Sequence, residues 1–373
     1  HKNWGCFNMA TVQSIFSFLY ENKKINFSKL NKKQSKLVHD IIQCKTVARG
    51  FNKDICDHCG DIQIHYNSCK NPSCPQCQAV KREVWTIKEK MNTLHVRYFH
   101  VVFTIPSELN PLVLLQPKLL YSILFNASAK TIKELCDDKK YLGAQVGFTS
   151  VLHTWGQNLS LHPHVHMIVS GGGIDKLGKW KNSKKKFFLP VKVVSKLFKG
   201  KFLSSLKKEF PKELLSNKSQ FNDIVNQCYK KDWVVYTKKP MHTPNKVIEY
   251  LSRYTHRIAI SNARIISHEN NKVTFKYKDY KDHNRIKEMT LDELEFFRRF
   301  MMHVLPKSFL KIRHYGFLGN RNKKTRLKTA RVLTNTPEQK EMVINYIEII
   351  SKVLKKDVSV CLACGQKRHH KLE

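Results

Sequence analysis

One stretch, residues 153–173, constrains the fold more than any other, because its pattern predicts a β-strand with two chemically different faces. Successive side chains of a strand point to opposite sides, so His164 and His166 share one face and Val165 points to the other. The apolar residues that follow predict a strand anchored in a hydrophobic core. The run Gly171–Gly173 predicts the end of the strand and a place where backbone can approach a ligand closely.

Two imidazoles side by side on a strand suit a divalent metal ion with coordination positions left open for a substrate. A third ligand is expected, but residues 139–174 contain no Asp or Glu. The nearest candidates are His153, which a hairpin would place across from His164, and Gln157 in the connecting loop. We favour His153 slightly, and His162 can instead shape the turn or touch substrate. The alternative interpretation is that these histidines are only hydrogen-bonded structural residues.

The charge of the chain points to a polyanionic partner. Lys and Arg number 67 against 29 Asp and Glu, a formal net charge of +38, and the excess is spread along the sequence. Such a field attracts phosphate backbones, so nucleic acid is the expected partner. No run of about eighteen apolar residues predicts a membrane span, and no secretory signal segment is recognisable. We therefore expect no membrane partner and a cytoplasmic, nucleoid-associated location in a bacterium.

Cysteine spacing predicts metal binding. Eleven cysteines in a chain with no export signal indicate thiols and metal rather than disulfides. The two C-x-x-C pairs are the spacing of a zinc ribbon or knuckle, and we expect one structural zinc ion to be held by Cys56, Cys59, Cys74 and Cys77. Cys69 could replace one of these or join Cys44 or His58 in a second site. Near the end of the sequence, a further possible zinc site comprises Cys361, Cys364 and His369.

Hydrophobic periodicity predicts a mixture of helices and antiparallel strands, which is an α+β fold. Helical patterns cover residues 9–50, 116–136, 189–235, 291–304 and 337–355. Strand patterns cover residues 101–105 and 146–154, the histidine strand that follows, and a three-stranded meander at 258–266, 272–280 and 285–291. Residues 54–80 lack either period and carry the cysteines instead.

A predicted helix at residues 244–254 supplies candidate nucleophiles. Tyr250 and Tyr254 are four residues apart, so both phenols project from one face of that helix. Aromatic residues at this spacing are more often part of a core. Beside a metal-type histidine pair in a nucleic-acid-binding chain, however, a phenolate can attack a phosphodiester and conserve the energy of the cleaved bond in a phosphotyrosine.

Basic residues near these tyrosines are candidates for contact with DNA. A charged group close to a phenol can stabilise the phenolate or bind the scissile phosphate, although a solvated helix face is an equally good interpretation of each residue alone. The candidates are Arg253, His256 and Arg257, followed by Arg313 and His314.

Four motifs together resemble one family. They are L-H-P-H-V-H-M-I-V-S-G-G-G, Y-L-S-R-Y-T-H-R-I-A-I-S-N, H-V-L-P-K-S-F-L-K-I-R-H-Y-G at 303–316, and Y-N-S-C-K-N-P-S-C-P-Q-C-Q at 66–78. With these motifs the chain resembles the HUH single-strand transposases of the rolling-circle, IS-ninety-one-like family. The similarity covers most of residues 35–320. Ser73 and Phe51-Asn52 depart from the family pattern, which often has histidine there, so no extra zinc ligand is expected at those places.

The resemblance implies an HUH-endonuclease-type fold, with a central antiparallel sheet flanked by helices, an N-terminal zinc-binding domain and a basic C-terminal region. It implies Mg²⁺ or Mn²⁺ at His164 and His166, and nucleophilic roles for Tyr250 and Tyr254. The implied reaction nicks single-stranded DNA at insertion-sequence ends and target sites, leaving a 5′-phosphotyrosine and a free 3′-hydroxyl. A second tyrosine would permit successive strand transfers.

The expected organisation has four parts: a helical and zinc-binding domain at 9–90, an HUH nuclease domain with the tyrosine helix at 91–257, a meander and basic DNA-binding region at 258–335, and a C-terminal helix with the possible second metal site at 336–373. Two other functions stay open at this point. One is a plasmid replication initiator or relaxase with the same chemistry. The other is a zinc-containing nucleic-acid-binding protein without catalysis. The oligomeric state, monomer or dimer, is not predicted.

Overall fold

The computed structural model describes residues 10–183, 189–215, 218–241, 259–280, 282–338 and 343–367. Several predicted site residues lie outside these ranges, namely Tyr250, Arg253, Tyr254, His256, Arg257 and His369. No helix within the described ranges is long and apolar enough to cross a membrane.

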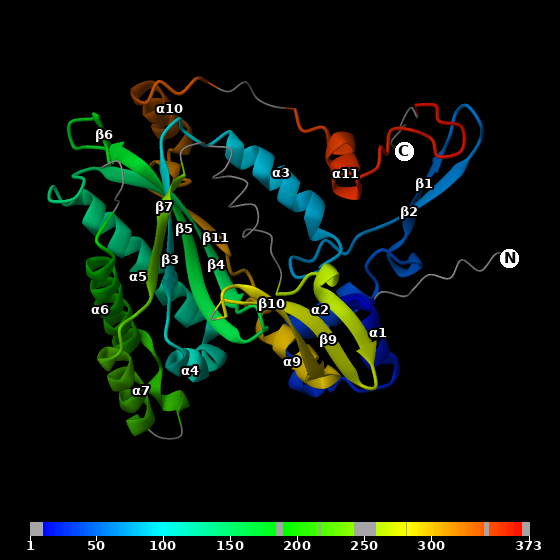
Figure 1. The fold of residues 1–373 in the computed structure, drawn as a ribbon, viewed down its shortest axis with the longest axis horizontal. Helices are drawn as coiled ribbons and strands as arrows, with labels where there is room; N and C mark the ends of the chain where they lie inside the picture. Colours follow the sequence, from blue (N-terminus) through cyan, green and yellow to red (C-terminus); the bar gives the residue numbers. More distant parts are fainter. Residues whose placement is uncertain are drawn as a thin grey trace.

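A six-stranded sheet forms the centre of the larger part of the molecule (Figure 1). Its main path runs β11-β4-β5-β3-β7, β6 pairs with β5, and every pairing is antiparallel. The predicted α+β fold with a central antiparallel sheet is therefore confirmed. The strands are β3 (Tyr98–Thr104), β4 (Gln145–Trp155), β5 (Leu161–Ile174), β6 (Trp180–Asn182), β7 (Val235–Met241) and β11 (Ile312–Tyr315).

Helices cover one face of this sheet and form its main hydrophobic core. Val165, Met167 and Val169 alternate along β5 and point to this face, where they share a core with Phe103 of β3 and Phe198 of α6. The helices on this side are α4 (Asn110–Leu115), α5 (Pro117–Asp137), α6 (Val191–Glu209) and α7 (Lys218–Lys230). The same alternation places His164 and His166 on the opposite face.

The opposite face is covered in part by α3 (Gln78–Lys90). Trp85 of this helix packs on Tyr98, Val151 and Ile168, one residue from each of three adjacent strands. Ile168 follows His166 by two residues, so both side chains point to the same face of β5. The helix α3 therefore covers this face next to the position of the histidines.

A second core joins segments that are far apart in the sequence. The ring of Phe16 lies 5.0 Å from the Phe297 ring and 5.2 Å from the Phe300 ring, measured between centroids. This core contains a three-stranded meander in the order β10-β9-β8, so it connects the predicted domains 9–90 and 258–335. Its first strand was predicted at 258–266 but begins at Ile265, because residues 262–264 form a 3₁₀ turn. Its elements are α1 (Val12–Glu21), α2 (Lys32–Ile42), β8 (Ile265–Glu269), β9 (Lys272–Asp279), β10 (Arg285–Asp292) and α9 (Glu293–Met302).

The remaining elements are small. The hairpin of β1 (Phe51–Ile55) and β2 (Ile62–Tyr66) projects from the molecule, and near it lies α11 (Tyr346–Leu354) (Figure 1). The helix α10 (Lys323–Leu333) packs near the sheet end through Leu327. Short 3₁₀ turns are η1 (Phe27–Lys29), η2 (Val47–Arg49), η3 (Ser107–Leu109), η4 (Lys212–Leu214), η5 (Asn262–Arg264) and η6 (Gly316–Leu318).

The prediction for Gly171–Gly173 is wrong, because β5 continues through the three glycines to Ile174. A Cβ atom on Gly172 would lie 2.6 Å from the carbonyl oxygen of Lys181, and one on Gly173 would lie 2.5 Å from that of Gln145. The close approach that needs glycine is therefore made by neighbouring protein backbone rather than by a ligand.

Gly316 offers a test of how tightly β11 is joined to β4. Its φ is +64°, and a Cβ atom there would lie 1.8 Å from the carbonyl oxygen of Val146. Gly316→Ala should lower the free energy of unfolding by roughly 2–5 kcal/mol, the sum of a left-handed backbone cost and an overpacking cost. Gly178→Ala is the matched control, because Gly178 has φ +75° with nothing within 4 Å of an added Cβ. Denaturant unfolding checks both, and equal losses would contradict the steric argument.

Candidate active site

Three histidines converge on the sheet face opposite the main core. In the register of β4 and β5, His153 lies directly across from His164, and Val151 lies across from His166. One ring nitrogen from each of the three histidines lies within 4.8 Å of the others. His153 and His166 are buried, at 3% and 7% exposed. The structure thus brings together the histidine pair and the favoured candidate for a third ligand.

Hydrogen bonding orients the imidazole of His164. Its Nδ1 lies 2.6 Å from the carbonyl oxygen of His162, so Nδ1 carries the proton and donates it. Nε2 of His164 then carries the lone pair that a metal ion needs. Burial lowers the pKa of His164 to about 4, so the ring is neutral at pH 7.

A fourth histidine, His100 on β3, supports the cluster and was missed in the sequence. Its Nε2 lies 2.9 Å from Nδ1 of His166, and the two rings stack with an interplanar angle of 11°. His100 is only 2% exposed. When Nδ1 of His166 is the donor in this contact, Nε2 of His166 carries the lone pair that a metal ion needs. The available signal was a histidine at the start of an otherwise aromatic and β-branched strand.

An aromatic and a cationic side chain back the cluster on the β4 side. The ring of Trp155 stacks on His153, with centroids 4.7 Å apart and planes 19° apart. Nζ of Lys311 lies 5.0 Å from the centroid of the Trp155 indole. Burial lowers the pKa of Lys311 to about 7. The Trp155 indole lies between the ammonium group of Lys311 and the His153 ring, so these two contacts fix the position of His153.

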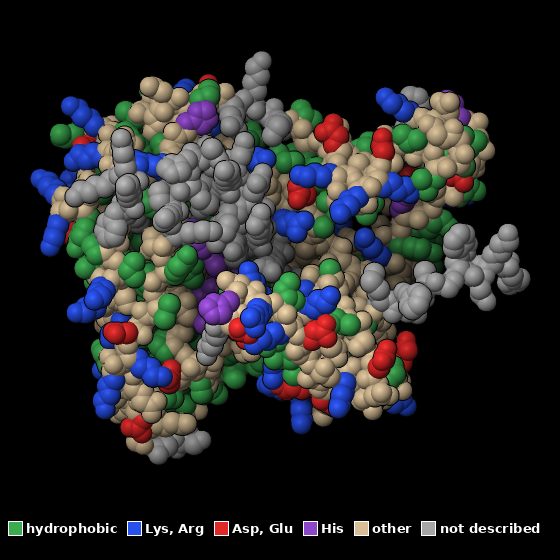
Figure 2. Space-filling view, viewed as in Figure 1, with side chains coloured by type: hydrophobic (Ala, Val, Ile, Leu, Met, Phe, Trp, Pro, Cys, Tyr) green, Lys and Arg blue, Asp and Glu red, His purple; other side chains and the backbone are tan. Residues whose placement is uncertain are grey.

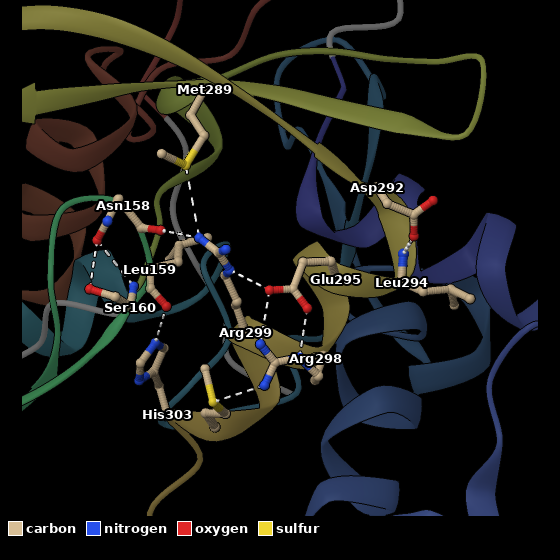
Figure 3. A network of polar contacts seen from close by, with 11 residues as sticks. Asn158, Leu159, Ser160, Met289, Asp292, Leu294, Glu295, Arg298, Arg299 and His303 are labelled. Atoms are coloured by element: carbon tan, nitrogen blue, oxygen red, sulfur yellow. Dashed lines mark hydrogen bonds and ion pairs between the residues drawn. The ribbon is translucent and has the colours of Figure 1, made fainter. Parts of the chain in front are cut away.

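The turn between β4 and β5 is held by α9 (Figure 3). Nη1 of Arg299 donates to the carbonyl oxygen of Asn158 at 3.2 Å, and Nε2 of His303 lies 3.1 Å from the carbonyl oxygen of Leu159. Leu159 has φ +63° and is fully buried in the second core. Glu295 in turn binds Arg299 at 2.7 Å. The tip of the histidine hairpin is therefore anchored in a core built by other segments.

The other candidates from this turn have different surroundings. Nε2 of Gln157 donates to the hydroxyl of Tyr280 at 3.2 Å, and the carbonyl oxygen of Gln157 accepts from Arg264. His162 is exposed, and its ring centroid lies 5.1 Å from that of His164. The structure thus gives Gln157 a partner on the meander side, while His162 supplies the carbonyl that orients His164.

Arg313 and His314, the second-rank candidates for DNA contact, point to opposite faces of β11 and are both engaged inside the protein. The guanidinium of Arg313 lies 4.3 Å from the ring centroid of Phe125, on the helix-covered face. Nδ1 of His314 lies 3.0 Å from the hydroxyl of Thr149 and 3.6 Å from a carboxylate oxygen of Glu89. The structure does not bring this pair to one surface.

Eight of the ten described cysteines form two clusters of four, whose sulfur atoms lie within 4.8 Å of one another in each cluster. The expected set of Cys56, Cys59, Cys74 and Cys77 is divided between them. The cause is the hairpin of β1 and β2, which pairs Ile55 with Ile62 next to its turn and separates that turn from the hairpin base by roughly 15 Å. The clusters are Cys44, Cys69, Cys74 and Cys77 at the base, and Cys56, Cys59, Cys361 and Cys364 at the turn.

The donor set of the histidine cluster discriminates between metals. It offers three imidazoles and no carboxylate among the described residues that form the cluster. Mg²⁺ prefers an oxygen shell, whereas imidazole suits transition metals. Of the two expected cations, Mn²⁺ fits these residues better than Mg²⁺.

Lys and Arg side chains are spread over the face shown in Figure 2 without forming one band. Figure 2 shows Lys and Arg spread across the view, over the α6 and α7 side as well as over the meander side, and histidine side chains near the middle of that face. Such a distribution provides long-range attraction for a polyanion from several directions.

Comparisons with known proteins show similarity to transposases over most of the chain. Residues 147–326 match a family model described as "Putative transposase", and residues 15–105 match a "Transposase zinc-binding domain". The chain is 39% identical over 373 residues to the "Putative transposase y4qJ" of Sinorhizobium fredii (strain NBRC 101917 / NGR234), covering 95% of this chain and 93% of that protein.

A second relative is the "Transposase for insertion sequence element IS801" of Pseudomonas savastanoi pv. phaseolicola, 30% identical over 292 residues, with 76% of this chain and 70% of that protein covered. No solved structure matches the chain significantly. The cluster of Cys44, Cys69, Cys74 and Cys77 lies wholly within the matched zinc-binding domain, which supports structural zinc in this part of the chain.

The free energy of unfolding should depend on pH through Glu295, which binds Arg299 and so helps to hold the turn between β4 and β5. Hydrogen bonds from Arg298 and then Arg299 lower the pKa of Glu295 to about 2. The carboxylate is favoured in the folded state, so its contribution to stability is present above the unfolded pKa of about 4.3 and is lost as pH falls towards 2. Glu295→Gln should therefore be less stable than the parent at pH 7, and the difference should shrink between about pH 4.5 and 2.

Denaturant midpoints at a series of pH values check this. The parent and the variant are compared at each pH, so that acid release of zinc affects both alike. Glu269→Gln, a change at an exposed carboxylate of β8, is the control and should show no such convergence. A constant difference between Glu295→Gln and the parent across this range would contradict the proposed linkage.

Proposed function

This chain belongs to the IS91 family of insertion-sequence transposases, and from that premise we propose that it nicks and rejoins single-stranded DNA at insertion-sequence ends through a 5′-phosphotyrosine intermediate, as in rolling-circle transposition. The observation that carries the proposal is the convergence of His153, His164 and His166 on the sheet face opposite the helix-packed core. A non-catalytic DNA-binding protein has no need for three imidazoles whose ring nitrogens converge on one point.

In this proposal the three histidines hold one Mn²⁺ or Mg²⁺ ion through ring nitrogens. When bound, the ion stabilises negative charge that develops on a phosphate oxygen. His164 is kept in the binding tautomer by the carbonyl of His162, and His166 is oriented by His100. The chain's own contribution is thus a set of ring nitrogens held in place by strand pairing and by these two contacts, with His164 neutral.

We assign the nucleophile to Tyr250 or Tyr254 on the sequence evidence. The phenolate oxygen forms a bond to phosphorus and the bond from phosphorus to the 3′-oxygen breaks. The leaving 3′-oxygen takes up a proton from water, so the departing strand carries a free 3′-hydroxyl. Rejoining reverses these steps with a different 3′-hydroxyl. Arg253, His256 and Arg257 are the proposed contacts to DNA near the tyrosines, and the bacterial nucleoid in the cytoplasm is the proposed place of action.

The central test is formation of a covalent adduct. Wild-type protein, Mn²⁺ and a labelled single strand bearing an insertion-sequence end should yield an adduct that survives a denaturing gel. The double change Tyr250→Phe and Tyr254→Phe should abolish it. His164→Ala should reduce the adduct rate by about 100-fold or more, since metal stabilisation of the transition state amounts to several kcal/mol.

DNA affinity distinguishes catalysis from structure in the same variants. His164→Ala should bind the strand nearly as well as wild type, because phosphate contacts supply most of the affinity. A wild-type protein that forms no adduct with any divalent cation would overturn the enzymatic proposal. Adduct formation at a plasmid origin but not at insertion-sequence ends would favour a replication initiator or relaxase instead.

His100 should affect the metal rather than the DNA. His100→Ala should weaken Mn²⁺ affinity by roughly 10–100-fold, the usual cost of losing a partner that orients a metal-binding histidine. Calorimetric Mn²⁺ titration checks this, and His100→Gln should recover part of the affinity by restoring a hydrogen bond to His166. The control is His314→Ala, on the same face but separated from β3 by strands β4 and β5, where affinity should be unchanged. If His100→Ala binds Mn²⁺ as tightly as wild type, the positioning role is wrong.

A further inference from the structure

The two C-x-x-C pairs that form the outer cysteine cluster come from opposite ends of the chain. Cys56 and Cys59 lie in the turn of the β1–β2 hairpin, and Cys361 and Cys364 lie beyond α11. The first pair belongs to the matched zinc-binding domain at 15–105, and the second lies outside it. We propose that these four cysteines bind one zinc ion and so close a zinc ribbon whose two halves are about 300 residues apart in the sequence.

Sulfur spacing is the first argument. Sγ of Cys56 lies 3.7 Å from Sγ of Cys364, and Sγ of Cys59 lies 3.7 Å from Sγ of Cys361. Four sulfurs at the usual 2.3 Å from a tetrahedral zinc ion are about 3.8 Å apart. Disulfide sulfurs are about 2.05 Å apart, so the spacing fits a shared ion and not two disulfide bonds.

The second argument is that the two pairs have the same local structure. Each is followed by glycine in the left-handed region, Gly60 with φ +71° and Gly365 with φ +74°. In both turns the glycine N–H donates to the carbonyl of the first cysteine, at 2.9 Å from Gly60 to Cys56 and 3.0 Å from Gly365 to Cys361. Such turns present two thiolates to one ion, and two of them complete a tetrahedral site.

The backbone hydrogen bonds on either side of the two Cys-x-x-Cys turns are also similar. The N–H of Cys56 donates to Asp61 at 2.9 Å, and the N–H of Cys361 donates to Gln366 at 2.8 Å. The first turn closes the paired strands β1 and β2. The second is flanked by an antiparallel bridge between Val360 and Lys367. Each half is therefore a hairpin end of the same kind.

Third, few other interactions hold the C-terminal segment in place. Among the described residues 343–367, only Ile349 and Cys361 are buried, at 5% and 1% exposed. The helix α11 contacts α3, and Lys352 pairs with Glu83 at 2.8 Å, but exposed ion pairs contribute little. A segment with so small a core needs another source of folding free energy, and metal binding provides one.

Zinc content provides the test, and it does not depend on the DNA reaction. The parent is the full chain with His164→Ala, so that the imidazole cluster adds no ion. We expect two zinc ions per chain by elemental analysis. The pair of changes Cys56→Ser and Cys59→Ser, the pair Cys361→Ser and Cys364→Ser, and all four changes together should each leave one. Cys228→Ala, a change at a buried cysteine outside both clusters, is the control and should leave two.

The combined variant is decisive, because two independent sites would lose two ions where a shared site loses one. Retention of two ions after Cys361→Ser and Cys364→Ser would also overturn the proposal. X-ray absorption on the parent, which needs no cysteine change, should show four sulfur neighbours per zinc ion, and a lower average sulfur count would contradict the site. Amide hydrogen exchange in α11 should accelerate in the variant lacking Cys361 and Cys364, while β4 and β5 exchange as before.

Discussion

The tip of the histidine hairpin is inserted into a core that the hairpin itself does not build. Leu159 adopts a left-handed backbone conformation and is buried among residues of the N-terminal helices, the meander and α9. Arg299 and His303 bind the carbonyl oxygens of Asn158 and Leu159. A β-branched or bulky residue in that backbone region is costly, and Leu persists there because its surroundings fix it. The relative position of His153 and His164 thus depends on segments that precede the hairpin in the sequence, the N-terminal helices, and on segments that follow it, the meander and α9.

Side chains alternate between the two faces of β5, so one face of the sheet is apolar and the other carries the histidines. Val165, Met167 and Val169 pack under the helices, whereas His164 and His166 occupy the other face with His153 and His100. Burial keeps His164 neutral, and hydrogen bonds to its Nδ1 and to that of His166 assign the remaining nitrogens. The arrangement of these nitrogens follows from strand geometry and from the contacts that orient His164 and His166.

Local patterns predicted much of this arrangement. The hairpin of β4 and β5, the last two strands of the meander and the long helix α5 follow from hydrophobic periodicity, and the position of His153 opposite His164 follows from strand pairing. His100 could not be predicted with the same means, because its partner His166 lies on a neighbouring strand whose register no local pattern encodes. The glycine run was misinterpreted because its close neighbours are other strands. Proximity in sequence pairs Cys56 and Cys59 with Cys74 and Cys77, whereas the pattern Cys-x-x-Cys-Gly, which occurs at 56–60 and again at 361–365, indicates the grouping found in the structure.

The proposed ribbon has a consequence for biosynthesis. The hairpin of β1 and β2 leaves the ribosome early, but its half of the tetrahedral site has no complement until residues 361–364 have been translated. The central sheet and its helices can therefore assemble while the outer cluster is still open. Metal binding at that cluster would be one of the last events of folding. A polypeptide released before residue 361 would carry Cys56 and Cys59 as free thiols without the second pair of zinc ligands.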